Sequence, residues 1–270
     1  KIKYLMRISN REDVGAELRA VFQSGRYIKS NSENATFDFS DTQPNTFRMA
    51  ILRSGDFNLY VMSETMETIL NELNDPRISL FFRETANKSG EYNGLLNGQD
   101  ASATSISVAD YSLPGTIFRE NTGTLDANFM TAWETGFLLA EAAERKLIDA
   151  DARELYNEAV KNSFSYWQTA IPAEYLDTGK AAYNSEGEDP LEQIITQKWL
   201  SGMINGYEGW IEYRRTGFPV LKNISASLNN GLIPLRMPYP AEEAALNAES
   251  YREATADNNN SINAAVWWDQ

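Results

Sequence analysis

The sequence of 270 residues contains no cysteine and no histidine. Without cysteine it has no disulfide, no thiol nucleophile and no thiolate metal site. Without histidine it cannot form a Ser-His-Asp triad, an HExxH zinc motif or most general-base arrangements. An enzyme with this composition would depend on carboxylates, lysine or tyrosine. We therefore expect a protein that is not an enzyme and that needs no metal or cofactor.

Basic residues and long apolar runs are also scarce. Lysine and arginine total 24 against 38 aspartates and glutamates, which gives a net charge of −14. A surface this negative repels nucleic acid and anionic lipid, so we expect no nucleic-acid partner. No stretch is apolar over the roughly 18 residues that a membrane-spanning helix requires, and the sequence shows no signal peptide. The 42% of hydrophobic residues is ordinary for a globular protein of one or two domains.

Helical signals begin at the first residues. Residues 1–8 have a helical composition and no N-cap before them, so we interpret them as the end of a helix. Ser9 and Glu12 have the S-x-x-E spacing of a capping box, which predicts the start of a second helix that ends at Gly25. A further helix is predicted over residues 63–73, and short extended pieces are expected in the polar stretch before it.

Two closely spaced amphipathic patterns follow at residues 129–147 and 151–167. The apolar stripe of the first begins at Phe129, and small residues alternate with large ones on the facing sides of both. Their spacing is that of a tetratricopeptide helical hairpin, in which small residues let two helices approach. We predict an antiparallel hairpin with four buried side chains. These are Trp133, Ala140, Tyr156 and Ala159.

The stretch "GYEGWIEYRRTGFPVL" raises the question of whether an arginine pair binds a ligand or ends a helix. Residues 191–215 are predicted to be helical, with a possible break at the Asn-Gly pair and with Tyr207 and Trp210 on the apolar face. Arg214 and Arg215 then occupy the last turn, where cations interact favourably with the helix dipole and bond free carbonyls. The Gly and Pro that follow end the helix. We therefore expect both arginines to be structural.

The order of several motifs resembles that of the SusD-like (SusD/RagB) outer-membrane nutrient-binding lipoproteins of Bacteroidetes, in the branch called SusD-like family 2. The motifs include "MRISNRED", "AWETGFLLAEAAER", "ITQKWLSGMINGYEGWIEYRRTGFPVL", "MPYPAEEAALNAESY" and "VWWDQ". The resemblance covers essentially residues 1–270 and corresponds to the C-terminal part of a single SusD-like domain. The family's signal peptide, lipidated cysteine and N-terminal half are absent from this sequence.

This resemblance implies a mostly α fold of tetratricopeptide-like helical hairpins with long irregular loops and few short strands. It also implies a binding subunit at the cell surface, on the outer membrane, that is anchored only through the missing N-terminal lipid. Such a subunit delivers an oligosaccharide, or in some relatives a peptide, to a SusC-type TonB-dependent transporter without catalysis. Two other classes stay open, a tetratricopeptide-type scaffold for a protein partner and a glycosidase that uses two carboxylates.

The segment from Arg83 to Asn128 is the expected place for ligand contacts. It is long and rich in Gly, Ser, Asn and Thr, and loops of this length are usually functional or mobile. Sugar binding requires aromatic faces together with amides, carboxylates or arginine. The candidate ligand-binding residues are Tyr92, Tyr111, Phe118, Arg119 and Asn121. The same residues could equally attach the loop to the body of the protein.

Overall fold

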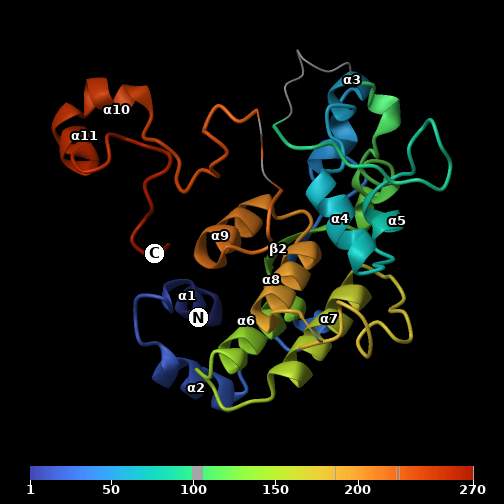
Figure 1. Cartoon of the computed structure of the whole chain (residues 1–270), viewed down its shortest axis with the longest axis horizontal. Helices are drawn as coiled ribbons and strands as arrows, with labels where there is room; N and C mark the ends of the chain where they lie inside the picture. Colours follow the sequence, from blue (N-terminus) through green and yellow to red (C-terminus); the bar gives the residue numbers. More distant parts are fainter. Residues whose placement is uncertain (99–105, 186, 223, 225, 270) are drawn as a thin grey trace.

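The computed structural model describes residues 1–98, 106–185, 187–222, 224 and 226–269. Helices dominate this part of the chain, and two short strands form one antiparallel pair (Figure 1). The α-helices are α1 (Ile2–Ile8), α2 (Gly15–Ser24), α3 (Ser54–Phe57), α4 (Glu64–Glu72), α5 (Ile78–Phe81), α6 (Ala132–Glu144), α7 (Ala152–Tyr166), α8 (Pro190–Ser201), α9 (Gly206–Thr216), α10 (Ala241–Leu246) and α11 (Ala248–Thr255). The strands are β1 (Ala35–Asp38) and β2 (Asp126–Met130). This confirms the predicted fold class.

Short 3-10 helices fill much of the irregular backbone between these elements. They are η1 (Asn31–Glu33), η2 (Arg48–Ile51), η3 (Val108–Asp110), η4 (Thr116–Phe118) and η5 (Thr122–Thr124). None of the helices in the described part of the chain has the length and apolar character needed to cross a membrane.

The α6–α7 hairpin forms the centre of the molecule and confirms the predicted pairing. Trp133 is 4% exposed, and Ala140, Tyr156 and Ala159 are fully buried. A Cβ atom added at Gly136 would lie only 2.8 Å from the Cβ of Ala159. The two helices therefore approach each other closely because both contribute small residues at the crossing.

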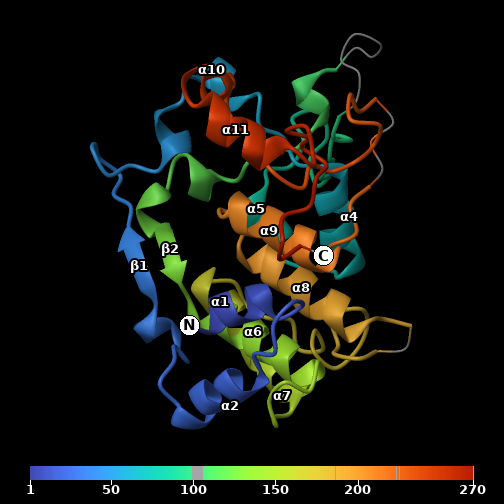
Figure 2. The same cartoon turned by 90° about the vertical axis from the view of Figure 1, so that its left-hand side faces the viewer.

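The other helices pack around this hairpin. Helix α8 lies along α6, and α1 also packs against α6 (Figure 1). Figure 2 shows the β1–β2 pair at one edge of the molecule, with α2 at one end and α10 and α11 at the other. The core consists of three neighbouring clusters, around α6–α7–α8, around α1–α2–α6, and around α4–α5–η4.

Two predicted helix starts were wrong, the one at Ser9 and the one at Phe129. The Oγ of Ser9 donates to the carbonyl of Met6 at 2.8 Å, so Ser9 ends α1 and forms no capping box. Helix α2 begins only at Gly15, whose amide donates to the Oδ1 of Asp13 at 3.1 Å. The signal was misplaced because a residue that can cap a helix start can also close the end of the preceding helix.

The predicted start at Phe129 was also wrong. Phe129 lies in β2 and is 70% exposed. Helix α6 starts at Ala132, because the hydroxyl of Thr131 accepts a hydrogen bond from the amide of Glu134 at 3.2 Å. The residues before that cap pair with β1 instead, in the register Thr36 to Asn128.

The predicted break before Gly206 is present and divides the long helix into α8 and α9. Its consequence was underestimated, because Tyr207 is 68% exposed rather than on the apolar face. The chain changes direction between the two helices, so the apolar stripe of α8 does not continue into α9. Gly217 ends α9 with φ +81°, as predicted.

Candidate functional site

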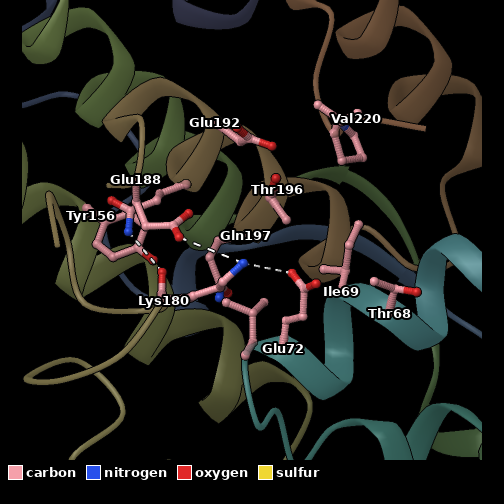
Figure 3. Close-up of a pocket in the computed structure, with 13 residues that line it drawn as sticks. Thr68, Ile69, Glu72, Tyr156, Lys180, Glu188, Glu192, Thr196, Gln197 and Val220 are labelled. Atoms are coloured by element: carbon pink, nitrogen blue, oxygen red, sulfur yellow. Dashed lines mark hydrogen bonds and ion pairs between the residues drawn. The ribbon is translucent and has the colours of Figure 1, made fainter. Parts of the chain in front are cut away.

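A pocket of about 280 Å³ lies between α4 and α8 (Figure 3). Its walls come from four parts of the sequence: α4, α7, the loop before α8 together with α8 itself, and the residues after α9. The lining residues are Thr68, Ile69, Glu72, Leu73, Tyr156, Lys180, Glu188, Glu192, Gln193, Thr196, Gln197, Pro219 and Val220.

The floor of this pocket is made of amides that already have partners. The Oε1 of Gln197 accepts from the Nη2 of Arg77 at 2.8 Å, and its Nε2 donates to the hydroxyl of Tyr175 at 2.8 Å. The Nε2 of Gln193 donates to two backbone carbonyls at 2.8 and 2.9 Å. These amides therefore fix the shape of the pocket and have little capacity left for a ligand.

Beneath the floor, Arg77 is fully buried and paired with Asp75. Its Nη2 lies 2.6 Å from the Oδ2 of Asp75, and its Nη1 donates to the hydroxyl of Ser163 at 2.9 Å. Burial raises the pKa of Tyr175 well above its ordinary value, so this hydroxyl stays protonated and donates to Asp75. The network ties the α4–α5 connection to α7 and α8.

The open side of the pocket carries most of the charge. The Nζ of Lys180 lies 3.0 Å from the Oε2 of Glu72 and 3.8 Å from the Oε1 of Glu188. Figure 3 shows Lys180 extending between these two glutamates, with Glu192 and Thr196 above them in this view. Burial, followed by the nearby Glu188, raises the pKa of Glu192.

Chemically, this pocket suits a ligand with hydroxyl or amine groups. The carboxylates of Glu188 and Glu192 accept hydrogen bonds, and the hydroxyl of Thr196 both donates and accepts. Ile69 and Val220 supply a small apolar wall. No cluster of three or more acidic side chains able to hold a metal ion occurs among the described residues.

The Arg83–Asn128 segment, where ligand contacts were predicted, is attached to the body at many points. The amide of Met62 donates to the carbonyl of Ser112 at 2.8 Å, and the amide of Leu95 donates to the carbonyl of Met62 at 2.8 Å. The amide of Gly94 donates to the Oε2 of Glu67 on α4 at 2.8 Å. Residues 99–105 of this segment lie outside the described part of the chain.

The five candidate residues have different environments. Tyr92 and Tyr111 are partly buried, and Tyr92 packs against the cluster around α4–α5–η4. Burial, followed by the charge of Glu84, raises the pKa of Tyr92. Asn121 is exposed, and its side chain makes no hydrogen bond with any described residue. The two tyrosines and Asn121 therefore keep surface that a ligand can reach.

Phe118 and Arg119 are more strongly engaged with the protein. Phe118 is 3% exposed, and its ring centre lies 6.4 Å from that of Phe81 and 6.4 Å from that of Trp167. Arg119 stacks on Phe57 at 4.3 Å and donates to the carbonyl of Leu52 at 3.1 Å. The structure brings Phe118, Arg119 and Asn121 together along one turn, but no hydrogen bond or ring contact in the described residues joins them to either tyrosine.

Arg214 and Arg215 are structural, as predicted. The Nη1 and Nη2 of Arg215 lie 2.5 and 2.6 Å from the two carboxylate oxygens of Glu141, and Nη2 lies 2.6 Å from Glu212. The guanidinium of Arg214 stacks between the rings of Trp210 and Trp268 at 4.3 and 4.4 Å. Arg215 thus joins α9 to α6, and Arg214 holds the C-terminal tail on α9.

The lining of the α4–α8 pocket was not predicted from the sequence. Its acidic side chains come from α4, the loop before α8, and α8. No local spacing in the sequence links these three segments. They meet only because α7 and α8 pack beside α4.

Comparison with known proteins gives a consistent assignment. A family profile described as "Starch-binding associating with outer membrane" matches residues 1–240. A chitin-binding SusD homolog from Flavobacterium johnsoniae is 26% identical with a TM-score of 0.81, and the match covers 100% of this chain and 61% of that chain. A SusD homolog from Bacteroides uniformis is 25% identical with a TM-score of 0.82, and the match covers 100% of this chain and 63% of that chain.

A SusD homolog from Bacteroides fragilis shows the same fold, with a TM-score of 0.86 at 23% identity and coverage of 100% and 65%. The chain therefore spans 61–65% of the length of these three solved structures. A search of the curated proteins found no match. Because the family profile covers most of the chain, the chain belongs to SusD-like family 2, a family of outer-membrane-associated binding proteins without catalytic activity.

Proposed function

We propose that this chain is part of a cell-surface subunit that binds an oligosaccharide and delivers it to a SusC-type TonB-dependent outer-membrane transporter. The observation that carries the proposal is the family match over residues 1–240, whose description names starch binding at the outer membrane. The chitin-binding homolog of the same fold supports a glycan as the ligand. The 270 residues would form the C-terminal part of a single SusD-like domain.

The ligand contacts that we propose begin with Tyr92 and Tyr111. A partly exposed tyrosine offers a flat face for the apolar side of a sugar ring and a hydroxyl for hydrogen bonding. Asn121 has a free amide at the surface, and Arg119 lies two residues before it. Phe118 is buried, so its role would be to hold this turn in place rather than to touch the ligand.

The α4–α8 pocket is a second region that we propose for ligand contact. Its carboxylates and the hydroxyl of Thr196 are groups that bind sugar hydroxyls. Among the described residues it has no open aromatic face, because Tyr156 is fully buried and its hydroxyl donates to the carbonyl of Ala181 at 2.8 Å. This pocket would therefore contribute hydrogen bonds rather than stacking.

Calorimetric titration tests the function directly. Starch and chitin oligosaccharides and a peptide mixture are titrated into the 270-residue chain and into a longer protein that carries it. Saturable oligosaccharide binding by the longer protein, weak or absent in the chain alone, is the expected result. Binding of peptides only would favour a peptide-uptake subunit. Binding of neither class would favour a tetratricopeptide-type scaffold for a protein partner.

A further inference from the structure

A second and much smaller cavity lies where β2, α6, α8 and α9 meet. Its volume is about 20 Å³, and it shares no lining residue with the α4–α8 pocket. The polar side chains on its wall include those of Asn128, Trp133, Glu134, Lys198, Glu208 and Glu212. A Cβ atom added at Gly209 would lie 2.9 Å from the Cδ1 of Trp199, so α9 closes tightly over this side of the cavity.

Two of these side chains have a buried donor atom without a hydrogen-bond partner in the described structure. The atoms are the Nδ2 of Asn128 and the Nε1 of Trp133. The buried Nζ of Lys198 is paired with Glu212. Trp133 and Lys198 are 4% and 5% exposed. The amide of Asn128 is oriented by the hydroxyl of Tyr166, which donates to its Oδ1 at 3.1 Å. Burying a donor without an acceptor is unfavourable, so two such donors on one cavity indicate an occupant that accepts hydrogen bonds.

The charges around the cavity decide what kind of acceptor fits. The carboxylates of Glu134, Glu208 and Glu212 also line it, and the only lining cation among the described residues, Lys198, lies 3.2 Å from the Oε2 of Glu212. Behind the lining, each carboxylate has a further cation: Lys3 lies 2.8 Å from Glu134, Arg7 lies 2.7 Å from Glu208, and Arg215 lies 2.6 Å from Glu212. An anion has no proton to donate to these carboxylates. A water molecule accepts from two donors and donates to two acceptors, which matches a wall that carries both.

We propose that this cavity binds a single water molecule. About 20 Å³ is enough for one water, which requires roughly 10–15 Å³. The water accepts from Trp133 and from Asn128, and it donates to the carboxylates. It thereby links the end of β2 and the first turn of α6 to Glu208 and Glu212 on α9.

Water–protein NMR on the intact chain tests this site. The indole N–H of Trp133 should show a direct rotating-frame cross-peak to a water molecule with a long residence time. The indole of Trp167 is the internal control, because it is similarly buried at 3% exposure but donates to the carbonyl of Ser201 at 3.0 Å. It should show no such cross-peak. Trp133→Phe assigns the signal by removing one indole resonance.

Two further measurements distinguish a bound water from magnetisation relayed through Lys198 and from a bound chloride ion. The Lys198→Met variant removes the ammonium group that could relay magnetisation, and the Trp133 cross-peak should persist in it. A chloride titration should leave the Trp133 indole shift unchanged. The proposal is overturned if the Trp133 indole has no water cross-peak, if that peak disappears with Lys198→Met, or if the indole shift follows chloride binding.

Discussion

Arg215 shows how a single side chain can look like a ligand site in the sequence and be structural in the fold. It is 5% exposed and bonded to Glu141 on α6 and Glu212 on α9. The sequence predicted its structural role from its place in the last turn of a helix. It could not identify Glu141 as the main partner, because that residue lies 74 positions away and the contact depends on how α9 packs on α6.

Removing Arg215 should therefore destabilise the protein strongly. Arg215→Ala removes the bidentate partner of Glu141, leaving it only Arg145, and leaves Glu212 only Lys198. Breaking a buried pair costs about 3–5 kcal/mol of unfolding free energy. Arg53→Ala is the matched control, because the Arg53 side chain is 89% exposed beside Asp56 and such pairs contribute less than about 1 kcal/mol. Urea unfolding measures both, and equal losses in the two variants would contradict the structural role of Arg215.

Glu212 should give the protein a characteristic response to acid. Burial opposes its charged form, but Lys198 and Arg215 prevail and hold the pKa of Glu212 at about 2, below its ordinary value of 4.5. A carboxylate whose pKa is lowered by folding stabilises the folded state at any pH above its ordinary pKa. This stabilisation is lost as the pH falls from that value toward about 2. The stability difference between wild type and Glu212→Gln should therefore be largest near neutral pH and shrink below pH 4.5. A stability difference that does not change with pH would contradict a lowered pKa of Glu212 in the folded protein.

At the scale of helices and strands, the sequence was most informative where the signal is local. The α6–α7 hairpin was predicted because its periodicity and small residues are written within two short stretches. The starts of α2 and α6 were not predicted correctly. Ser9 closes the preceding helix, and Phe129 lies in β2, the strand that pairs with β1. Strand pairing with a segment about 90 residues earlier has no local signal, and only the fold selects it over helix extension.

The crossing of α6 and α7 supplies a prediction at this scale. Gly136→Leu should lower the unfolding free energy by about 1–3 kcal/mol, because any Cβ there meets Ala159 at 2.8 Å and forces the helices apart. Gly55→Leu is the matched control, since a Cβ at Gly55 meets nothing within 4 Å. It should change stability by no more than about 0.5 kcal/mol. Equal effects would show that the close approach at Gly136 is not required.

For the molecule as a whole, the composition and the family assignment both support the proposed binding role. The absence of cysteine and histidine argued against catalysis, and the chain belongs to a family of binding proteins. The fold class was predicted from the resemblance to SusD-like proteins, and the local helical patterns at residues 129–167 and 191–215 agree with it. The α4–α8 pocket could not be predicted from the sequence. Its lining is assembled from segments more than 100 residues apart, such as those that contain Glu72 and Glu188.

The central claim, oligosaccharide binding through the Arg83–Asn128 segment, is tested most directly by calorimetry on a longer protein that carries this chain. Tyr92→Ala and Tyr111→Ala should each weaken oligosaccharide binding by about 1–2 kcal/mol, the usual contribution of one aromatic contact. Arg214→Ala is the control, which should lower the melting temperature and leave affinity per folded molecule unchanged. Wild-type affinity in both tyrosine variants, or loss of affinity in Arg214→Ala at an unchanged melting temperature, would contradict the account.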